Sequence, residues 1–198
     1  GHGGHGAMPH MAVDPVVAAA SVVMALQTVV ARNVDPQQTA VVSVGVLQAG
    51  HANNVIPHSA HLQLSVRSLD NGVRQLLQKR ITEIVQAQAQ SFGVTAEIDY
   101  RRGYAVLMNS KEETDFARQV GIELVGADKV TLQGAALTGS EDFAYMLEKR
   151  PGCYLLIGNG AGDSHGACMV HNPGYDFNDD NVAIGAAYWT LLAQRFLA

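Results

Sequence analysis

The sequence has little basic charge and few cysteines, and each shortage excludes a class of protein. Among 198 residues, 13 lysines and arginines stand against 18 aspartates and glutamates, so the formal net charge is −5. Such a chain has no basic field to attract a phosphate backbone, and we expect no nucleic acid partner. Its two cysteines, Cys153 and Cys168, form neither a disulfide framework nor a Cys-x-x-Cys metal clip. The expected compartment is therefore the reducing cytoplasm.

Long apolar runs are also missing. The longest, residues 16–24, is rich in alanine and is broken by Ser21, whereas a helix needs about 20 apolar residues to cross a bilayer. We therefore expect no membrane partner. A hydrophobic content of 47% with 16% charged residues is instead the ordinary balance of a globular chain with a buried core.

The first half of the sequence predicts an α/β sandwich. Asp14 and Asp70 are expected to cap two amphipathic helices. In one strand apolar residues alternate with polar ones, which places Arg67 on an open face. The first expected helix begins at Pro15, runs for about 18 residues and is stopped at Asn33, and the second spans about 72–91; the expected strands span 39–47, 60–68 and 95–100. Adding one strand before Gly1 gives the βαββαβ arrangement, an antiparallel sheet with both helices on one face.

The pattern changes after residue 103, and we expect a second domain over residues 104–198. There, helices alternate with short apolar strands, which is typical of an α/β layer. Ser110 is expected to cap the first helix, short buried strands are expected at 130–132 and 154–157, and a closing helix at 180–197.

The opening segment GHGGHGAMPH is the first candidate for chemistry. Glycines let a backbone bend freely, so His5 can be presented to a ligand at close range. A tag remnant or a surface loop is an equally weighted interpretation of the segment alone. A loop of this kind normally follows a strand, so we expect the chain to be part of a longer protein.

Three residues elsewhere are candidates for binding. His171 lies in a predicted loop, and imidazole is the commonest protein ligand of zinc-like metals, although an ordinary loop histidine is the more frequent case. Asn54 and Arg67 together can clamp a carboxylate, because a guanidinium fork matches its two oxygens. Taken singly, these two are a turn former and a solvated strand residue.

The segment TGSEDF is a small-residue turn before a predicted helix. The free amide groups at Gly139 and Ser140 can receive an anion, or Ser140 simply caps the helix. A serine hydrolase using Ser140 with His165 or His171 is disfavoured, because the sequence contains no GxSxG elbow.

Six segments follow one another along the chain in this order: GGHGAMPH, DPVVAAASVVMALQTVVARNVDP, NNVIP, SVRS, TGSEDFAYM and MVHNPGYDFNDD. Together they resemble the metal-dependent amidohydrolase and carboxypeptidase family that includes hippurate hydrolase and the hydrolases of indoleacetyl-amino acids. The resemblance implies a βαββαβ ferredoxin-like lid and dimerisation domain at residues 1–103, without its first strand. Residues 104–198 would be the C-terminal part of an α/β metallopeptidase catalytic domain.

The resemblance also implies an activity and its partners. The substrate would be an N-acyl amino acid, cleaved at its amide bond by water activated on two divalent metals, Zn, Mn or Co. The protein would be a homodimer through the lid domain. His5 would donate to the oxyanion in the partner's site, Asn54, Arg67, Gly139 and Ser140 would lie around the substrate carboxylate, and His171 would bind metal.

By the resemblance, the family's Cys-Gly-His-Asp-Gly-His type metal motif and the Glu-Glu pair that contains the general base belong to the N-terminal half of such enzymes, which these 198 residues do not include. We therefore expect a hydrolase fragment that binds no metal and is inactive by itself. The alternative is a non-catalytic dimerisation or binding module.

Overall fold

The computed structural model describes residues 1–164 and 167–198, which form two compact units. The first unit contains Gly1–Val106 together with the short segment Thr138–Ser140. The second contains Leu107–Leu137 and the described part of Glu141–Ala198. The boundary between the two units lies three residues beyond the one expected from the sequence. In addition, Thr138–Ser140, which is distant in sequence, belongs to the first unit.

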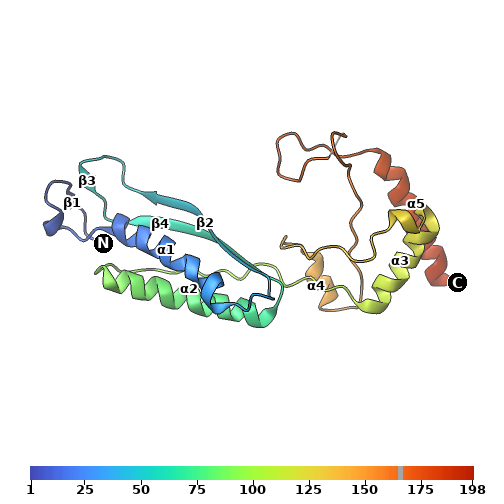
Figure 1. Cartoon of the computed structure of the whole chain (residues 1–198), viewed down its shortest axis with the longest axis horizontal. Coiled ribbons are helices and arrows are strands. Elements are labelled where there is room, and N and C mark those ends of the chain that lie inside the picture. Colours follow the sequence, from blue (N-terminus) through green and yellow to red (C-terminus); the bar gives the residue numbers. More distant parts are fainter. Residues whose placement is uncertain (165–166) are drawn as a thin grey trace. The chain divides into compact units, whose positions relative to one another are not determined.

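In the first unit two helices cover one face of a two-stranded antiparallel sheet (Figure 1). The helices are α1 (Pro15–Asn33) and α2 (Asn71–Ser91), and the strands are β2 (Ala40–Ala49) and β4 (Ala60–Ser68). The predicted caps are confirmed. Asp14 accepts a hydrogen bond from the Val16 amide at 2.7 Å, and Asp70 accepts one from the Val73 amide at 2.9 Å. Each cap satisfies an amide that the first helical turn leaves unpaired.

The core of this unit lies between the helices and the sheet. Leu26 and Val29 of α1 meet Leu77 of α2, and all three side chains are fully buried. The alternation predicted for β4 is confirmed, since its apolar residues pack on this core. Its other face is exposed, with the side chains of His61, Gln63, Ser65 and Arg67.

Helix α1 is predominantly apolar. With a mean hydropathy of 1.6 over 18 residues, it is long and apolar enough to cross a membrane by length and composition alone. It extends beyond the apolar run at residues 16–24, and Ser21, which interrupts that run, donates a hydrogen bond to Gln88 of α2 at 2.6 Å. One face of α1, with Val22, Leu26 and Val29, packs in the core of the unit.

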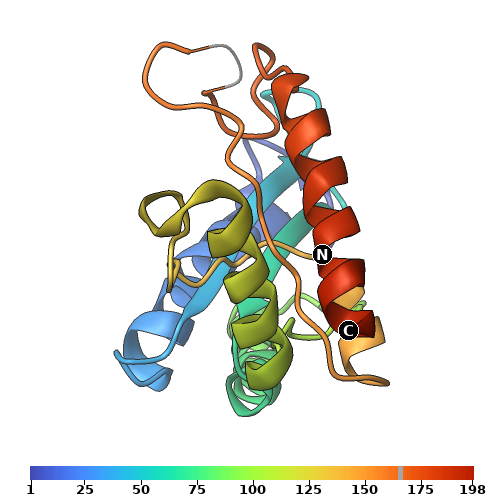
Figure 2. The ribbon, with the colours of Figure 1, turned by 90° about the vertical axis from the view of Figure 1, so that its right-hand side faces the viewer.

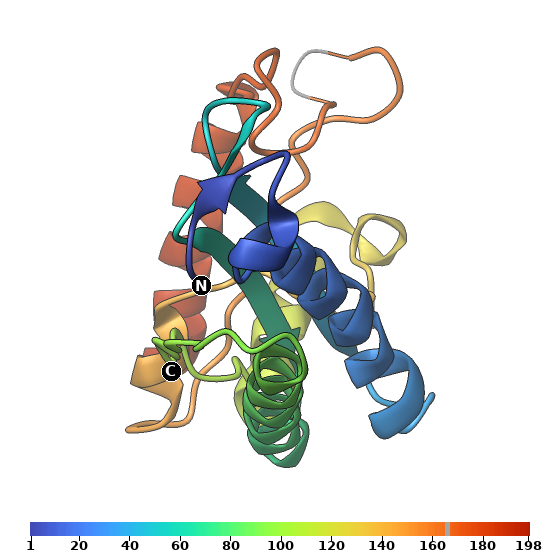
Figure 3. The same cartoon turned by 90° about the vertical axis from the view of Figure 1, so that its left-hand side faces the viewer.

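A second, smaller sheet stands at one end of the unit (Figure 3). Strand β1 (Gly4–His5) pairs antiparallel with β3 (Val55–Ile56), and the short helix η1 (Pro9–Met11) follows β1. The backbones of His2 and Val13 exchange two hydrogen bonds of 2.9 Å. Backbone hydrogen bonds therefore hold the opening loop to the rest of the unit. This was not predicted from the sequence, because a strand of two residues is too short to show alternating polar and apolar residues.

The strand predicted at residues 95–100 is absent from the structure. In the βαββαβ arrangement the last strand pairs with the first, which we expected before Gly1, so this segment has no neighbouring strand to bond. Tyr100 nevertheless packs against the core, and burial raises the pKa of its hydroxyl.

In the second unit α3 (Lys111–Val125) and α5 (Asp180–Leu197) lie side by side (Figure 2). The hydroxyl of Tyr188 on α5 donates to the carbonyl of Ala117 on α3 at 3.0 Å. Arg195 and Glu123 form an ion pair between the same helices. The unit also contains η2 (Ala127–Lys129) and α4 (Phe143–Leu147).

Two predictions for the second unit were wrong. Residues 130–132 and 154–157 form no strand, and Leu155, Leu156 and Ile157 are exposed rather than buried. These segments have no strand beside them in the described part of the unit, so no ladder of hydrogen bonds forms. Ser110 stands at the N-cap position of α3 without capping it, because its hydroxyl accepts from the Gly152 amide at 3.1 Å.

Candidate functional site

His5 and Asn54 lie next to each other at one end of the first unit. His5 is paired with Val55, the residue after Asn54, and the Gly6 amide donates to the Asn54 carbonyl at 2.8 Å. Both His5 and Asn54 are exposed. The structure thus brings together two of the residues singled out from the sequence, in what we call the His5 cluster (His5 and Asn54).

A backbone hydrogen bond determines which ring nitrogen of His5 carries the proton. The Ala7 amide donates to Nδ1 of His5 at 3.1 Å. A nitrogen that accepts this bond has no proton of its own, so the neutral ring carries its proton on Nε2. His5 therefore offers an N–H donor, which is the group needed to stabilise a developing oxyanion.

Glycines are required in the opening loop because its backbone lies very close to the backbone of residues 54–58. Gly3, Gly4 and Gly6 all have ordinary φ angles. A Cβ on Gly3 would lie 2.6 Å from the carbonyl oxygen of Ile56, and one on Gly6 would lie 3.0 Å from that of Asn54. These glycines are therefore needed for close contact between backbones, and not for the unusual bending expected from the sequence.

Arg67 and Ser140 form a second cluster, which we call the Arg67 cluster. Arg67 donates from Nη1 to the Ser140 hydroxyl and from Nε to the Ser65 hydroxyl, the latter at 3.2 Å. Gly139 is beside Ser140, and a Cβ there would meet nothing within 4 Å. The interpretation of Ser140 as a helix cap is wrong, because α4 begins after Asp142 and the Ser140 hydroxyl bonds Arg67.

The two clusters lie at opposite ends of β4. Asn54 belongs to the connection before Ala60, and Arg67 lies near the other end of the strand. At about 3.4 Å per residue, the seven steps from Ala60 to Arg67 span about 24 Å. The structure therefore separates Asn54 and Arg67 of one chain by the length of β4, so the two do not meet around one carboxylate within a single chain.

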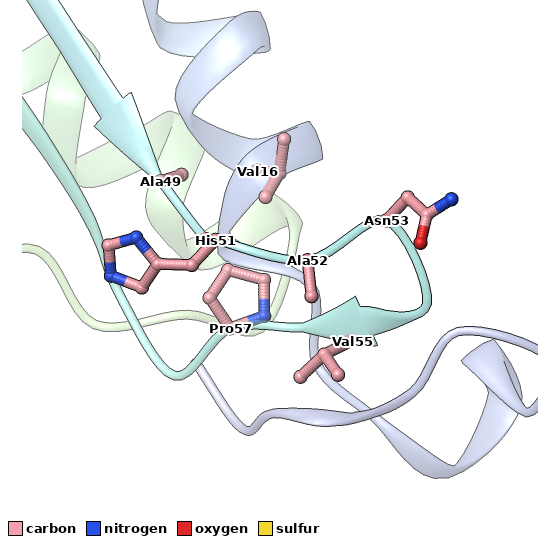
Figure 4. Close-up of a pocket in the computed structure, with 8 residues that line it drawn as sticks. Val16, Ala49, His51, Ala52, Asn53, Val55 and Pro57 are labelled. Atoms are coloured by element: carbon pink, nitrogen blue, oxygen red, sulfur yellow. The ribbon is translucent and has the colours of Figure 1, made fainter.

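An open hollow of about 350 Å³ adjoins the His5 cluster (Figure 4). Val55, the cross-strand neighbour of His5, contributes to its wall. The lining combines polar and apolar groups and comes from the start of α1 and the segment between β2 and β4: Val16, Ala49, Gly50, His51, Ala52, Asn53, Val55 and Pro57.

His171 is in the second unit, on an exposed turn. Its φ of 69° is in the left-handed region, which non-glycine residues seldom adopt. Such a conformation costs of the order of 1–3 kcal/mol and is often found at functional positions. The disfavoured partner His165 lies outside the described residues.

A complete metal centre does not fit the residues that the structure describes. Within residues 1–164 and 167–198, no three His, Cys, Asp or Glu side chains gather closely enough to hold a metal ion. His171 is one imidazole, and a stable site needs three or four ligands.

Glu141, within the TGSEDF segment, and Tyr154 form a pair that was not predicted from the sequence. The hydroxyl of Tyr154 is hydrogen bonded to the Glu141 carboxylate, which holds the pKa of Glu141 below its ordinary value and raises the pKa of Tyr154. Glu141 also accepts from the Phe143 amide at 3.2 Å. The pair fixes the turn that follows Ser140, and no local pattern in the sequence connects its two members.

Comparison with known proteins places the chain among hydrolases. It matches Peptidase family M20/M25/M40 over residues 2–195. Hippurate hydrolase of Campylobacter jejuni is 40% identical over 197 residues, covering 100% of this chain and 50% of the relative. N-acetyldiaminopimelate deacetylase of Lactococcus lactis is 42% identical over 163 residues, covering 80% and 42%. This chain thus spans about half the length of these curated relatives.

A solved structure agrees with the sequence relatives. The YXEP protein of Bacillus subtilis, a dinuclear metal binding peptidase from the M20 family, matches with a TM-score of 0.70 at 25% identity. The match covers 91% of this chain and 45% of that protein. The resemblance drawn from the six ordered segments is confirmed, and the chain belongs to Peptidase family M20/M25/M40.

Proposed function

We propose that the protein containing this chain is a metal-dependent amidohydrolase that cleaves the amide bond of N-acyl amino acids, either hippurate-like or N-acetylated. Membership of the M20/M25/M40 family supports this, as do a hippurate hydrolase and an N-acetylated amino acid deacetylase among the relatives. The observation that carries the proposal is the pair of half-sites on the first unit. One supplies an N–H donor suited to an oxyanion, and the other a guanidinium suited to a carboxylate.

Arg67 binds the free carboxylate of the substrate. The hydroxyls of Ser65 and Ser140 accept two of its N–H groups and thereby orient the planar fork. The remaining N–H groups match the two carboxylate oxygens. Gly139, next to Ser140, lies in open space.

His5 donates from Nε2 to the amide oxygen of the substrate. When water adds to the carbonyl carbon, this oxygen gains negative charge and the hydrogen bond strengthens. Loss of such a donor typically raises the barrier by about 3 kcal/mol. Asn54, beside His5, supplies an amide group to the same substrate.

The half-sites require two copies of the chain. Because they lie about 24 Å apart along β4, His5 and Asn54 of one copy complete the site at Arg67 of the other. We propose a homodimer through the first unit, completed as a ferredoxin-like βαββαβ lid, with two equal sites related by a twofold axis. Cys153 and Cys168 are both free thiols, in keeping with a cytoplasmic enzyme.

His171 is proposed as one ligand of the metal centre, and its left-handed backbone supports a functional role. The chain by itself is expected to bind no metal and to be inactive, because the described residues supply no further cluster of ligands. Zn, Mn and Co all suit an imidazole and carboxylate ligand set.

Hydrolysis assays of the full-length protein test the proposal. We expect cleavage of hippurate or N-acetyl amino acids, loss of activity on treatment with EDTA, and recovery on adding Zn, Mn or Co. Matched substrates with a carboxamide in place of the free carboxylate should be cleaved poorly. Hydrolysis that resists the chelator would contradict the proposal. A folded dimer inactive on the whole panel would favour the non-catalytic dimerisation module.

A further inference from the structure

His58, in the connection between β3 and β4, contacts the opening loop at three points. Its Nδ1 accepts a hydrogen bond from the Gly3 amide at 3.1 Å. Its carbonyl accepts one from the Gly1 nitrogen at 3.0 Å. Its ring lies edge-on to that of His2, with the centroids 5.8 Å apart. His58 is therefore the residue of this connection that holds the loop through both its side chain and its backbone.

Gly3 is the point at which His58 acts on the loop. A Cβ on Gly3 would lie 2.6 Å from the Ile56 carbonyl oxygen and 3.2 Å from the His58 nitrogen, so the two backbones are in close contact there. Gly4, the next residue, begins β1 and pairs with Ile56. The hydrogen bond from Gly3 to His58 thus fixes where β1 starts, immediately before His5.

We propose that His58 is a positioning residue for His5, an inference that rests on the proposed function. By holding the Gly3 amide, Nδ1 of His58 seats β1 against β3 and directs the Nε2–H of His5 toward the amide oxygen in the site of the other copy. A shift of His5 would weaken a hydrogen bond that matters most in the transition state. Binding of the substrate carboxylate at Arg67 would be unaffected.

Steady-state kinetics of the full-length protein with two substitutions test this role. In His58→Phe the ring remains but the acceptor is lost, whereas in His58→Asn an amide oxygen replaces Nδ1 as acceptor. We expect His58→Phe to lower kcat about 10-fold with little change in KM, since misplacing a catalytic group by 1 Å can cost about 100-fold. His58→Asn should retain most of kcat. His61→Phe, at an exposed histidine of β4, should leave both constants unchanged.

A double-mutant cycle separates positioning from a general structural effect. If His58 acts through His5, adding His58→Phe to His5→Ala causes no further loss of kcat. An equal loss in both backgrounds, or equal losses in His58→Phe and His58→Asn, would overturn the inference. So would a large effect of His5→Ala with none of His58→Phe. An unchanged kcat in His5→Ala would instead overturn the proposed role of His5, and the inference with it.

Discussion

A methyl group would meet different surroundings at Gly3, just before β1, and at Gly45, at the register shift of β2. At Gly3 the new Cβ would lie 2.6 Å from a backbone carbonyl oxygen, whereas at Gly45 the nearest atom is 4.0 Å away. We expect Gly3→Ala to push β1 from β3 and to lower kcat of the full-length enzyme about 10-fold, as His5 is displaced. Gly45→Ala, the matched control, should keep kcat and stabilise the fold by about 0.4–1 kcal/mol in chemical denaturation. Similar kinetics for both variants would contradict the close-approach argument.

Arg67 allows a test of the carboxylate interaction that leaves its charge in place. Lysine retains the positive charge but lacks the planar fork that Ser65 and Ser140 orient. We expect Arg67→Lys to raise KM for hippurate about 10- to 100-fold, the range for losing a charge-assisted hydrogen bond worth about 1.5–3 kcal/mol. Hippuramide, which has no carboxylate, should show nearly the same low activity with both enzymes. A parallel loss on both substrates would assign Arg67 a structural role.

The roles of some residues can be predicted from the sequence, whereas those of others cannot. His5, Arg67 and Ser140 stand in short motifs whose order along the chain points to one family. His58 has no such motif, and its importance appears only when its Nδ1 is seen on the Gly3 amide. The pairing of Tyr154 with Glu141 is likewise invisible in sequence, because a contact between distant residues leaves no local periodicity.

Among the elements, the starts of α2 and α3 show that a good capping residue is not always a cap. Asp70 accepts from the Val73 amide, whereas the hydroxyl of Ser110 bonds Gly152 instead of its own helix. We expect Asp70→Ala to lower the free energy of unfolding by about 0.5–2 kcal/mol, and Asp70→Asn to lower it much less. Urea denaturation of the full-length protein followed by circular dichroism measures both. Equal losses would mean that the charge of Asp70, and not its hydrogen bond, stabilises α2.

The helices and the β2–β4 pair were predictable because each of these elements leaves a pattern within its own stretch of sequence. A helix forms its hydrogen bonds within one segment, and its buried face repeats at a regular spacing. A strand needs a neighbour, so residues 95–100 and 154–157 fit the strand pattern without forming one. The pairing of β1 with β3 was not predicted, because each strand has only two residues and so shows no alternating pattern in the sequence.

At the scale of the whole molecule, the sequence predicts which residues belong to the proposed site but not which of them lie next to each other. Asn54 and Arg67 are closer in sequence than Arg67 and Ser140, yet the structure joins the second pair and separates the first. The separation follows from the length of β4, because an extended strand keeps its two ends far apart. The proposed site, which uses both clusters, is therefore proposed to combine two chains.

Mixed dimers test that requirement directly. In a dimer of one His5→Ala and one Arg67→Ala subunit, the intact Arg67 of the first meets the intact His5 of the second, so one of the two sites is whole. We expect each variant alone to be nearly inactive and the purified mixed dimer to recover about half the wild-type kcat. The matched control combines His5→Ala with Asn54→Ala, which lie in the same cluster, so both sites of that mixed dimer lack one member. Recovery in both mixtures, or in neither despite verified mixed dimers, would show that the two clusters do not meet across the subunits.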